Sequence, residues 1–180
     1  MMLNIFFGPV VNAARGIAIQ VQSAIQSFVS SFQTALNPQI TKNYASGNLS
    51  YMHNLMFRSA RFSFFLLFLL ALPILLEAHY ILRLWLGTYP EQTVVFMRWI
   101  IGVSLIYTIA NPCIVANQAT GKVKVYQAVV GGILLMILPI SYIVLKLGAP
   151  GYSVFIVHFC VEAVAQLARM LILRKLIDLP

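Results

Sequence analysis

The sequence predicts an all-α fold, a polytopic membrane helix bundle with about five transmembrane helices. The chain is 61% hydrophobic and only 9% charged, whereas soluble domains are about one quarter charged. Five apolar stretches along the chain approach the roughly 20 residues that a helix needs to cross a bilayer. This combination is typical of membrane proteins, so the chain is divided into membrane spans rather than into soluble domains.

The first predicted span, residues 16–36, contains no charged side chain but many amides and serines. We expect this helix to stop at Asn37-Pro38, because the residue before a proline is disfavoured in the helical conformation. The fifteen residues before the span are expected to form a loop that arrives from a helix missing from the chain.

The other four spans are predicted at residues 60–83, 99–119, 125–145 and 152–173. The third of them contains Asn111-Pro112 in its middle, as a candidate helix kink. A proline inside a membrane helix frees backbone carbonyls, which can line a cavity or permit bending. Many such kinks serve packing alone, so both interpretations stay open.

The basic residues indicate the orientation of the chain, because Lys and Arg collect on the cytoplasmic side of membrane proteins. One side receives eight of them, namely Lys42, Arg58, Arg61, Lys122, Lys124, Arg169, Arg174 and Lys175. The other side receives four, namely Arg15, Arg83, Arg98 and Lys146. The prediction is an N-terminus outside and a C-terminus in the cytoplasm. The net charge of +8 comes with no nucleic-acid-binding motif, so no nucleic-acid partner is expected.

The amides of the first span form one stripe along the helix. On a wheel of about 100° per residue with Arg15 at zero, Gln22 lies at about −20°, Gln26 at about +20° and Gln33 at about zero. An unsatisfied amide in hydrocarbon costs several kcal/mol, so the stripe must face protein or water. It forms either interhelical hydrogen bonds or a wall of a hydrated pathway, and its length of about five turns favours the pathway.

A second polar face lies on the fifth span. His158, Glu162, Gln166 and Arg169 are spaced four, four and three residues apart, so they share one side of the helix. Glu162 is near the middle of the span, where a charge is costly and is a functional candidate by default. It could carry a proton, bind a cation or pair with another helix. Arg169 lies about 10 Å farther along the axis, which we expect to be too far for a direct pair.

Catalytic and cofactor-binding motifs are not recognisable in the sequence. It contains no GxSxG, HExxH or glycine-rich phosphate loop. Cys113 and Cys160 fall inside apolar runs and lack the spacing of metal ligands. The prediction is a protein that is not an enzyme and that uses no cofactor or metal.

The stretch ARGIAIQVQSAIQSFVSSFQTALNPQITKNYASGN, followed by LWLG at 84–87 and QATGK at 118–122, resembles the polysaccharide (O-antigen-type) flippases of the multidrug/oligosaccharidyl-lipid/polysaccharide exporter superfamily. The resemblance implies two lobes around a polar cavity in the bacterial cytoplasmic (inner) membrane. Residues 1–180 would be a partial C-terminal lobe that lacks the first lobe of its parent transporter.

The implied substrate is a lipid-linked oligosaccharide of the undecaprenyl-diphosphate type, flipped across the membrane for surface polysaccharide such as lipopolysaccharide. The residues that would line its pathway are Arg15, Gln22, Gln26, Gln33 and Gln166. Glu162, with Arg169 as the other intramembrane charge, would couple transport to an ion gradient.

Three alternatives stay open. The first is a cation-coupled multidrug exporter of the same superfamily, in which efflux depends on Glu162. The second is a non-transporting membrane subunit, in which the glutamine stripe is buried and dry. The third is a membrane-embedded glycan polymerase or ligase, which is disfavoured because no loop is long enough to carry catalytic charges.

Overall fold

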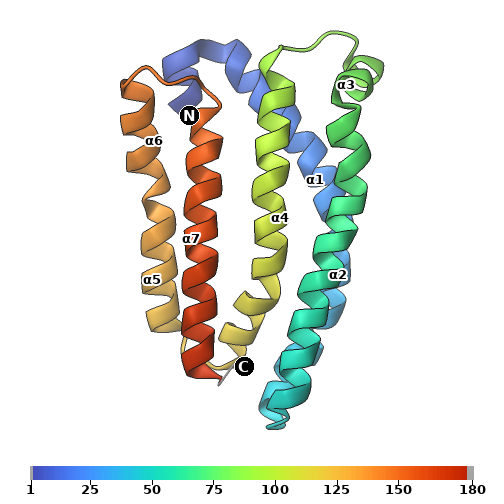
Figure 1. The fold of residues 1–180 in the computed structure, drawn as a ribbon, viewed down its shortest axis with the longest axis vertical. Coiled ribbons are helices and arrows are strands. Elements are labelled where there is room, and N and C mark those ends of the chain that lie inside the picture. The colour runs from blue at the N-terminus through green and yellow to red at the C-terminus, as the bar shows by residue number, and fades with distance from the viewer. Residues whose placement is uncertain (1, 178–180) are drawn as a thin grey trace.

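The computed structural model describes residues 2–177, and every secondary-structure element among them is a helix. The long helices run side by side and alternate in direction, so the two ends of the chain lie at opposite ends of the bundle (Figure 1). This confirms the predicted all-α membrane bundle. The helices are α1 (Met2–Ala45), α2 (Leu49–Leu76), α3 (Ala78–Leu86), α4 (Gln92–Ala119), α5 (Val123–Leu135), α6 (Ile137–Lys146) and α7 (Ser153–Leu176).

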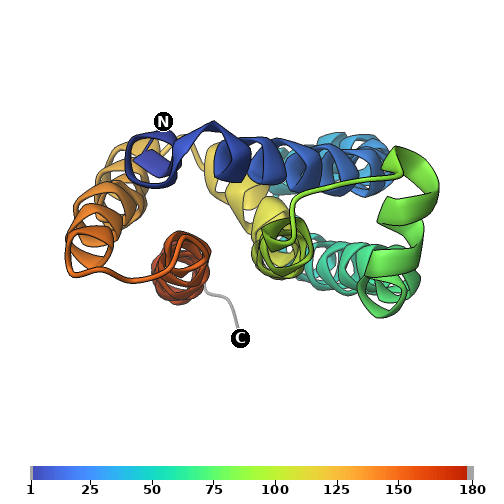
Figure 2. The same ribbon diagram turned by 90° about the horizontal axis from the view of Figure 1, so that it is seen from above.

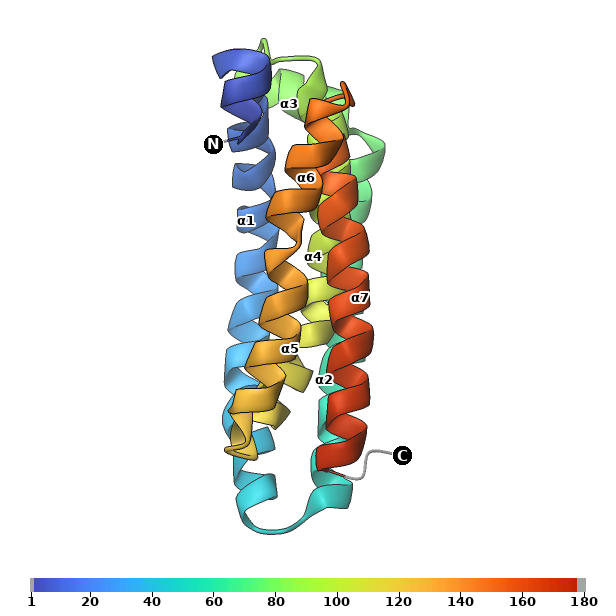
Figure 3. The ribbon, with the colours of Figure 1, turned by 90° about the vertical axis from the view of Figure 1, so that its left-hand side faces the viewer.

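Within the described residues, four helical segments are long and apolar enough to span a membrane, namely α2, α4, α5 together with α6, and α7. The amides and hydroxyls of α1 lower its hydropathy, and α1 is not one of these four. It is nevertheless the longest helix, with 44 residues, and it runs the length of the bundle (Figure 3). α1 is therefore a polar helix built into an otherwise apolar bundle.

The first helix does not stop at Asn37-Pro38, so that expectation is wrong. α1 continues through Pro38 to Ala45. Ile40, two residues beyond the proline, is fully buried in a cluster with Met52 and Met56 of α2. Burying a side chain of this size contributes about 2 kcal/mol. This contribution offsets much of the free-energy cost of the hydrogen bond that a proline removes from a helix.

The residues before the first predicted span are helical, so the expectation of a loop is also wrong. α1 is kinked at Gly8, whose φ of 81° and ψ of −177° are not helical. Pro9 follows as the first residue of the continuing helix, where a proline costs no hydrogen bond. The turns before the kink lie at the end of the bundle beside α6 (Figure 2), where Leu3 is buried and packs beside Gly151.

Two predicted spans are each divided in the structure. The span at 60–83 is interrupted at Glu77, after which α3 lies across the end of the bundle (Figure 2). The span at 125–145 is interrupted at Met136, because Pro139 has no N–H to donate to the Leu135 carbonyl. By contrast, α4 ends at Ala119 as predicted.

α4 is the central helix of the bundle, and it packs on α1, α2 and α7. One buried cluster, which includes Val29, Leu67 and Phe96, joins α1, α2 and α4. A second cluster around Ile40 and Leu173 lies at the other end of the bundle, where it joins α1, α2, α4 and α7. α1 and α7 pack chiefly on α4 rather than on each other, and a cavity lies between them.

Candidate functional site

The cavity between α1, α4 and α7 has a volume of about 200 Å³. Arg15 and Gln22, two of the predicted pathway residues, are on its α1 side. Ser104 of α4 and His158 of α7 also line it. The rest of the lining is apolar, from Ile19, Ile100, Val103 and Phe155. The cavity therefore combines a guanidinium, an amide, a hydroxyl and an imidazole with an apolar surface.

Gln33, at the other end of the same stripe, is in a buried interface. Its side chain is buried, and Nε2 donates a hydrogen bond of 2.9 Å to the backbone carbonyl of Thr108 in α4. Thr108 stands four residues before Pro112, which has no N–H, so this carbonyl lacks its usual donor within the helix. Gln33 supplies the donor that the proline removes.

This hydrogen bond connects two features that the sequence presented separately, the amide stripe and the Asn111-Pro112 kink. α4 is continuous through Pro112, and its axis changes direction near this point (Figure 1). The interhelical hydrogen bond is the role that the structure gives to Gln33. The sequence signal that could have revealed it is Pro112 itself. In a membrane helix, the backbone carbonyl four residues before a proline needs a hydrogen-bond donor other than the missing N–H.

Gln26 lies between these two environments. Its side chain is half-buried, and its Oε1 is enclosed without a hydrogen-bond partner in the described part of the chain. The stripe thus passes from Arg15 and Gln22 beside a cavity, through Gln26, to Gln33 in a sealed contact.

The hydroxyls beside the stripe are satisfied within α1 itself. Ser27, Ser30 and Thr34 are exposed, and each donates to a carbonyl of the preceding turn at 2.7–2.9 Å. Such bonds let a hydroxyl face lipid at little cost. These hydroxyls therefore do not indicate whether this face of α1 is hydrated, whereas the amides and Arg15 do.

α4 contributes Ser104 to the cavity lining, a residue that the sequence did not single out. Tyr107 and Asn111 follow Ser104 by three and seven residues, so all three lie on one face of the helix. Tyr107 is exposed, and Oδ1 of Asn111 is enclosed without a partner among residues 2–177. The three-and-four spacing of these residues was a usable signal, hidden by the apolar residues around it.

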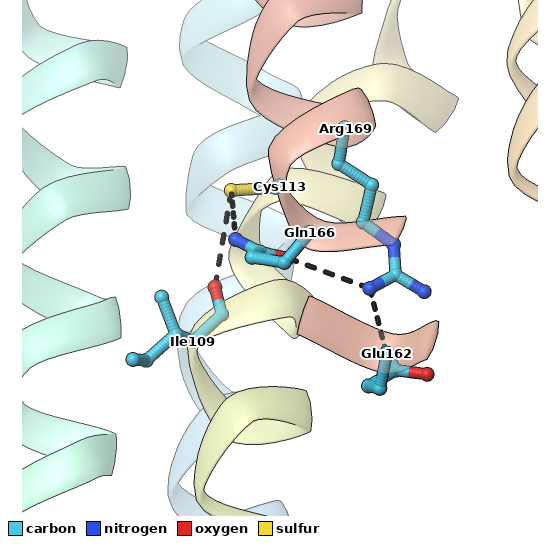
Figure 4. Close-up of polar contacts among 5 residues, drawn as sticks. All are labelled: Ile109, Cys113, Glu162, Gln166 and Arg169. Atoms are coloured by element: carbon cyan, nitrogen blue, oxygen red, sulfur yellow. Dashed lines mark hydrogen bonds and ion pairs between the residues drawn. The ribbon is translucent and has the colours of Figure 1, made fainter. Parts of the chain in front are cut away.

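The polar face of α7 contains a direct ion pair. Nη1 of Arg169 lies 2.7 Å from Oε1 of Glu162, and both side chains are buried (Figure 4). The expectation that the two residues are too far apart to pair is wrong. Side chains on a helix point toward its N-terminus, and the long arginine reaches back over two turns.

Gln166 extends this pair toward α4. Its Oε1 accepts a hydrogen bond of 3.4 Å from Arg169, and its Nε2 donates to Sγ of Cys113 at 3.9 Å (Figure 4). The Cys113 thiol lies 3.8 Å from the Ile109 carbonyl of its own helix. Gln166 therefore belongs to a network that links α7 to α4, and it does not line the cavity between α1, α4 and α7.

Two of the basic residues counted for the orientation do not lie at the ends of the bundle. Arg169 is in the ion pair, and Arg15 lines the cavity. The other basic residues are divided between the two halves of the bundle. Seven lie in the half nearer the turn from α1 to α2, and three lie in the half nearer the connection from α2 to α4. The charge difference keeps its direction, and the orientation of the termini stays a prediction.

The MatE family model matches residues 1–143 of the chain. The matched residues run from α1 into α6, whereas α7 with its ion pair follows them. No curated protein and no solved structure matched the chain. Members of the family are membrane transporters rather than enzymes. Because the match covers most of the chain and the fold is a membrane helix bundle, the chain belongs to the MatE family of the multidrug/oligosaccharidyl-lipid/polysaccharide exporter superfamily.

Proposed function

We propose that the chain forms one wall of the pathway of an exporter that flips a lipid-linked oligosaccharide across the cytoplasmic membrane of a bacterium. The observation that carries the proposal is the cavity with Arg15, Gln22 and Ser104 on its walls. Amides and hydroxyls exchange hydrogen bonds with sugars, and a guanidinium binds phosphate oxygens in pairs. Among residues 2–177, no carboxylate lines this cavity, so nothing in the described lining repels a diphosphate.

The proposed substrate is of the undecaprenyl-diphosphate type, and the first lobe of the parent transporter would supply the opposite wall. In the predicted orientation the cavity lies nearer the outside of the cell. Gln33 lies about 17 Å farther along α1 than Gln22 of the cavity, nearer the cytoplasm. The seal between Gln33 and Thr108 would then close the cytoplasmic part of this wall while the outer part is open.

Complementation tests this function. A full transporter that carries this sequence, expressed in a strain without its own flippase, should restore surface polysaccharide. Gln22→Leu should reduce that restoration strongly, because it removes an amide from the cavity. The matched control is Gln20→Leu, an exposed amide of the same helix that does not line the cavity. Equal restoration by both variants would refute the proposed pathway.

A cation-coupled multidrug exporter is the second candidate, and family membership is equally compatible with it. A specific observation favours it, since Glu162 lies one turn of α7 from His158 of the cavity, and half of the lining residues of that cavity are apolar. The same transporter should then export a lipophilic cationic dye, and Glu162→Gln should abolish the efflux. Restored polysaccharide without dye efflux would exclude this candidate.

The dry hydrogen bond of Gln33 favours the third possibility, a subunit that packs but does not transport. Cysteine labelling separates it from a pathway. In a background with Cys113→Ser and Cys160→Ser, a charged thiol reagent should label Gln22→Cys and leave Gln33→Cys unlabelled if the cavity is wet. Equal protection of both positions would indicate a subunit that is sealed along its whole length.

A further inference from the structure

A larger cavity, of about 630 Å³, lies at the end of the bundle where α2 gives way to α3 and the chain then enters α4. None of its lining residues belongs to the cavity between α1, α4 and α7. Gly87 turns the chain there with a φ of 69°, a conformation that favours glycine. The lining residues are His79, Arg83, Gly87, Thr88, Tyr89 and Glu91.

The position of α3 places this cavity at the surface of the bilayer. α3 has nine residues, too few to span a membrane, and it directly follows the apolar span of α2 while lying across the end of the bundle (Figure 2). Ala78 and Leu82 face the core. Tyr80 and Leu84, in contrast, are 66% and 76% exposed. An amphipathic helix of this kind lies in the interface with its apolar side chains at the acyl boundary.

The charges of the cavity are complementary to a zwitterion. Arg83 and Glu91 both line it, and within residues 2–177 neither is in an ion pair. Tyr89 and His79 are linked by a hydrogen bond of 2.9 Å between the hydroxyl and Nδ1, which fixes one side of the cavity. The cavity thus offers one guanidinium and one carboxylate, each free to bind a group of opposite charge.

We propose that this cavity binds the headgroup of an amine-bearing phospholipid, of the phosphatidylethanolamine type, from the adjacent leaflet. Arg83 binds the phosphodiester, and Glu91 accepts hydrogen bonds from the primary ammonium. The acyl chains follow the exposed apolar side chains of Tyr80 and Leu84, which lie four residues apart on α3, and that of Leu76 at the end of α2. This site is independent of the transported substrate and of the proposed function.

The chemistry of the two charges predicts a selectivity among lipids. Phosphatidylglycerol has a phosphate for Arg83 but no ammonium for Glu91. Phosphatidylcholine has a cationic nitrogen with no N–H to donate. Because a hydrogen bond between two charged groups is worth more than one kcal/mol, we expect phosphatidylethanolamine to be retained about tenfold more strongly than either.

Native mass spectrometry of the full chain in detergent, titrated with each of the three lipids, tests the proposal. Glu91→Gln should remove the preference for phosphatidylethanolamine, and Arg83→Gln should weaken the binding of all three. The matched controls are Glu77→Gln and Lys146→Gln, two exposed charges outside the cavity, which should leave the preference unchanged. Equal binding of the three lipids by the unaltered chain, or the same loss in Glu77→Gln as in Glu91→Gln, would overturn it.

A second measurement does not depend on variants of the charged residues. Trp99→Phe leaves Trp85 of α3 as the sole tryptophan. In phosphatidylethanolamine vesicles with bromine at known depths on the acyl chains, Trp85 fluorescence should be quenched best by the shallowest bromine. Quenching only from the bilayer centre, or none at any depth, would contradict an interfacial α3 and with it the lipid site.

Discussion

The helices α1 and α7 each carry a polar face through the bundle, and they satisfy it in opposite ways. On α7, Arg169 bonds to Glu162 and to Gln166, three residues of one helix. On α1, Gln33 bonds to α4, and Gln22 faces a cavity. A long arginine can reach a partner two turns away in its own helix, whereas Gln33 finds its partner on another helix. The polar face of α1 therefore depends on its surroundings more than the polar face of α7 does.

The largest expected effect comes from breaking the internal pair of α7. Glu162→Gln leaves Arg169 buried without its counter-charge, so we expect the free energy of unfolding to fall by about 3–5 kcal/mol. Denaturant unfolding in detergent, followed by circular dichroism, measures this change. Lys146→Gln removes an exposed charge and is the control.

Replacing both partners sharpens the same comparison. Glu162→Leu with Arg169→Met removes the two charges together, and it should recover most of the lost stability. A single variant as stable as the unaltered chain would mean that α7 does not depend on the pair. A double variant as unstable as the single one would mean that the two side chains stabilise the fold through contacts other than their ion pair.

The next largest effect is expected at the contact between α1 and α4. Gln33→Leu leaves the buried Thr108 carbonyl without a donor, which should cost about 1–3 kcal/mol. Pro112→Ala restores an N–H to the helix, so Gln33→Leu should cost much less in that background. A double-mutant cycle measures the coupling. The same cost in both backgrounds would contradict the assignment of Gln33 to the carbonyl that Pro112 frees.

Gln22 should behave differently from Gln33, although both belong to one stripe. Its side chain has no hydrogen-bond partner among residues 2–177, so Gln22→Leu should change the free energy of unfolding by less than about 0.5 kcal/mol. Polysaccharide transport by the full transporter should nevertheless fall. A loss of stability as large as that of Gln33→Leu would instead place Gln22 in a packing contact.

The smallest effects are expected from the hydroxyls of α1. Ser30→Ala and Thr34→Ala remove bonds to carbonyls of the same helix, so each should alter stability by no more than about 0.5 kcal/mol. The same unfolding assay measures them. A larger loss in either variant would show that the hydroxyl contributes more to stability than its bond within α1.

The prolines show which part of the fold the sequence could predict. Composition predicted the bundle correctly, and the end of α4 at Ala119 was correct to the residue. Pro38 was expected to end a helix and lies inside α1, whereas a turn at Met136 separates α5 from α6 three residues before Pro139. Tertiary packing helps α1 to continue, because Ile40 is buried beyond Pro38, and no local pattern shows how much packing a later residue will gain.

The candidate site was predictable to a similar depth. Periodicity correctly placed Glu162, Gln166 and Arg169 on one face of a helix, and two of the pathway candidates do line the cavity. The partners of each group were not predictable. The separation of Arg169 and Glu162 along the helix axis did not take account of the length of the arginine side chain. The partner of Gln33 depends on which helix packs against α1.

The bond between Gln33 and Thr108 also limits how the two helices can move. One rung of the α4 hydrogen-bond ladder is completed by a side chain from another helix. Sliding α1 past α4 by a single turn, about 5.4 Å, would open that rung and strand a carbonyl in an apolar surrounding. The two helices are therefore expected to rock as one rigid unit, and motion within the bundle should occur along α7 or the divided pair α5 and α6.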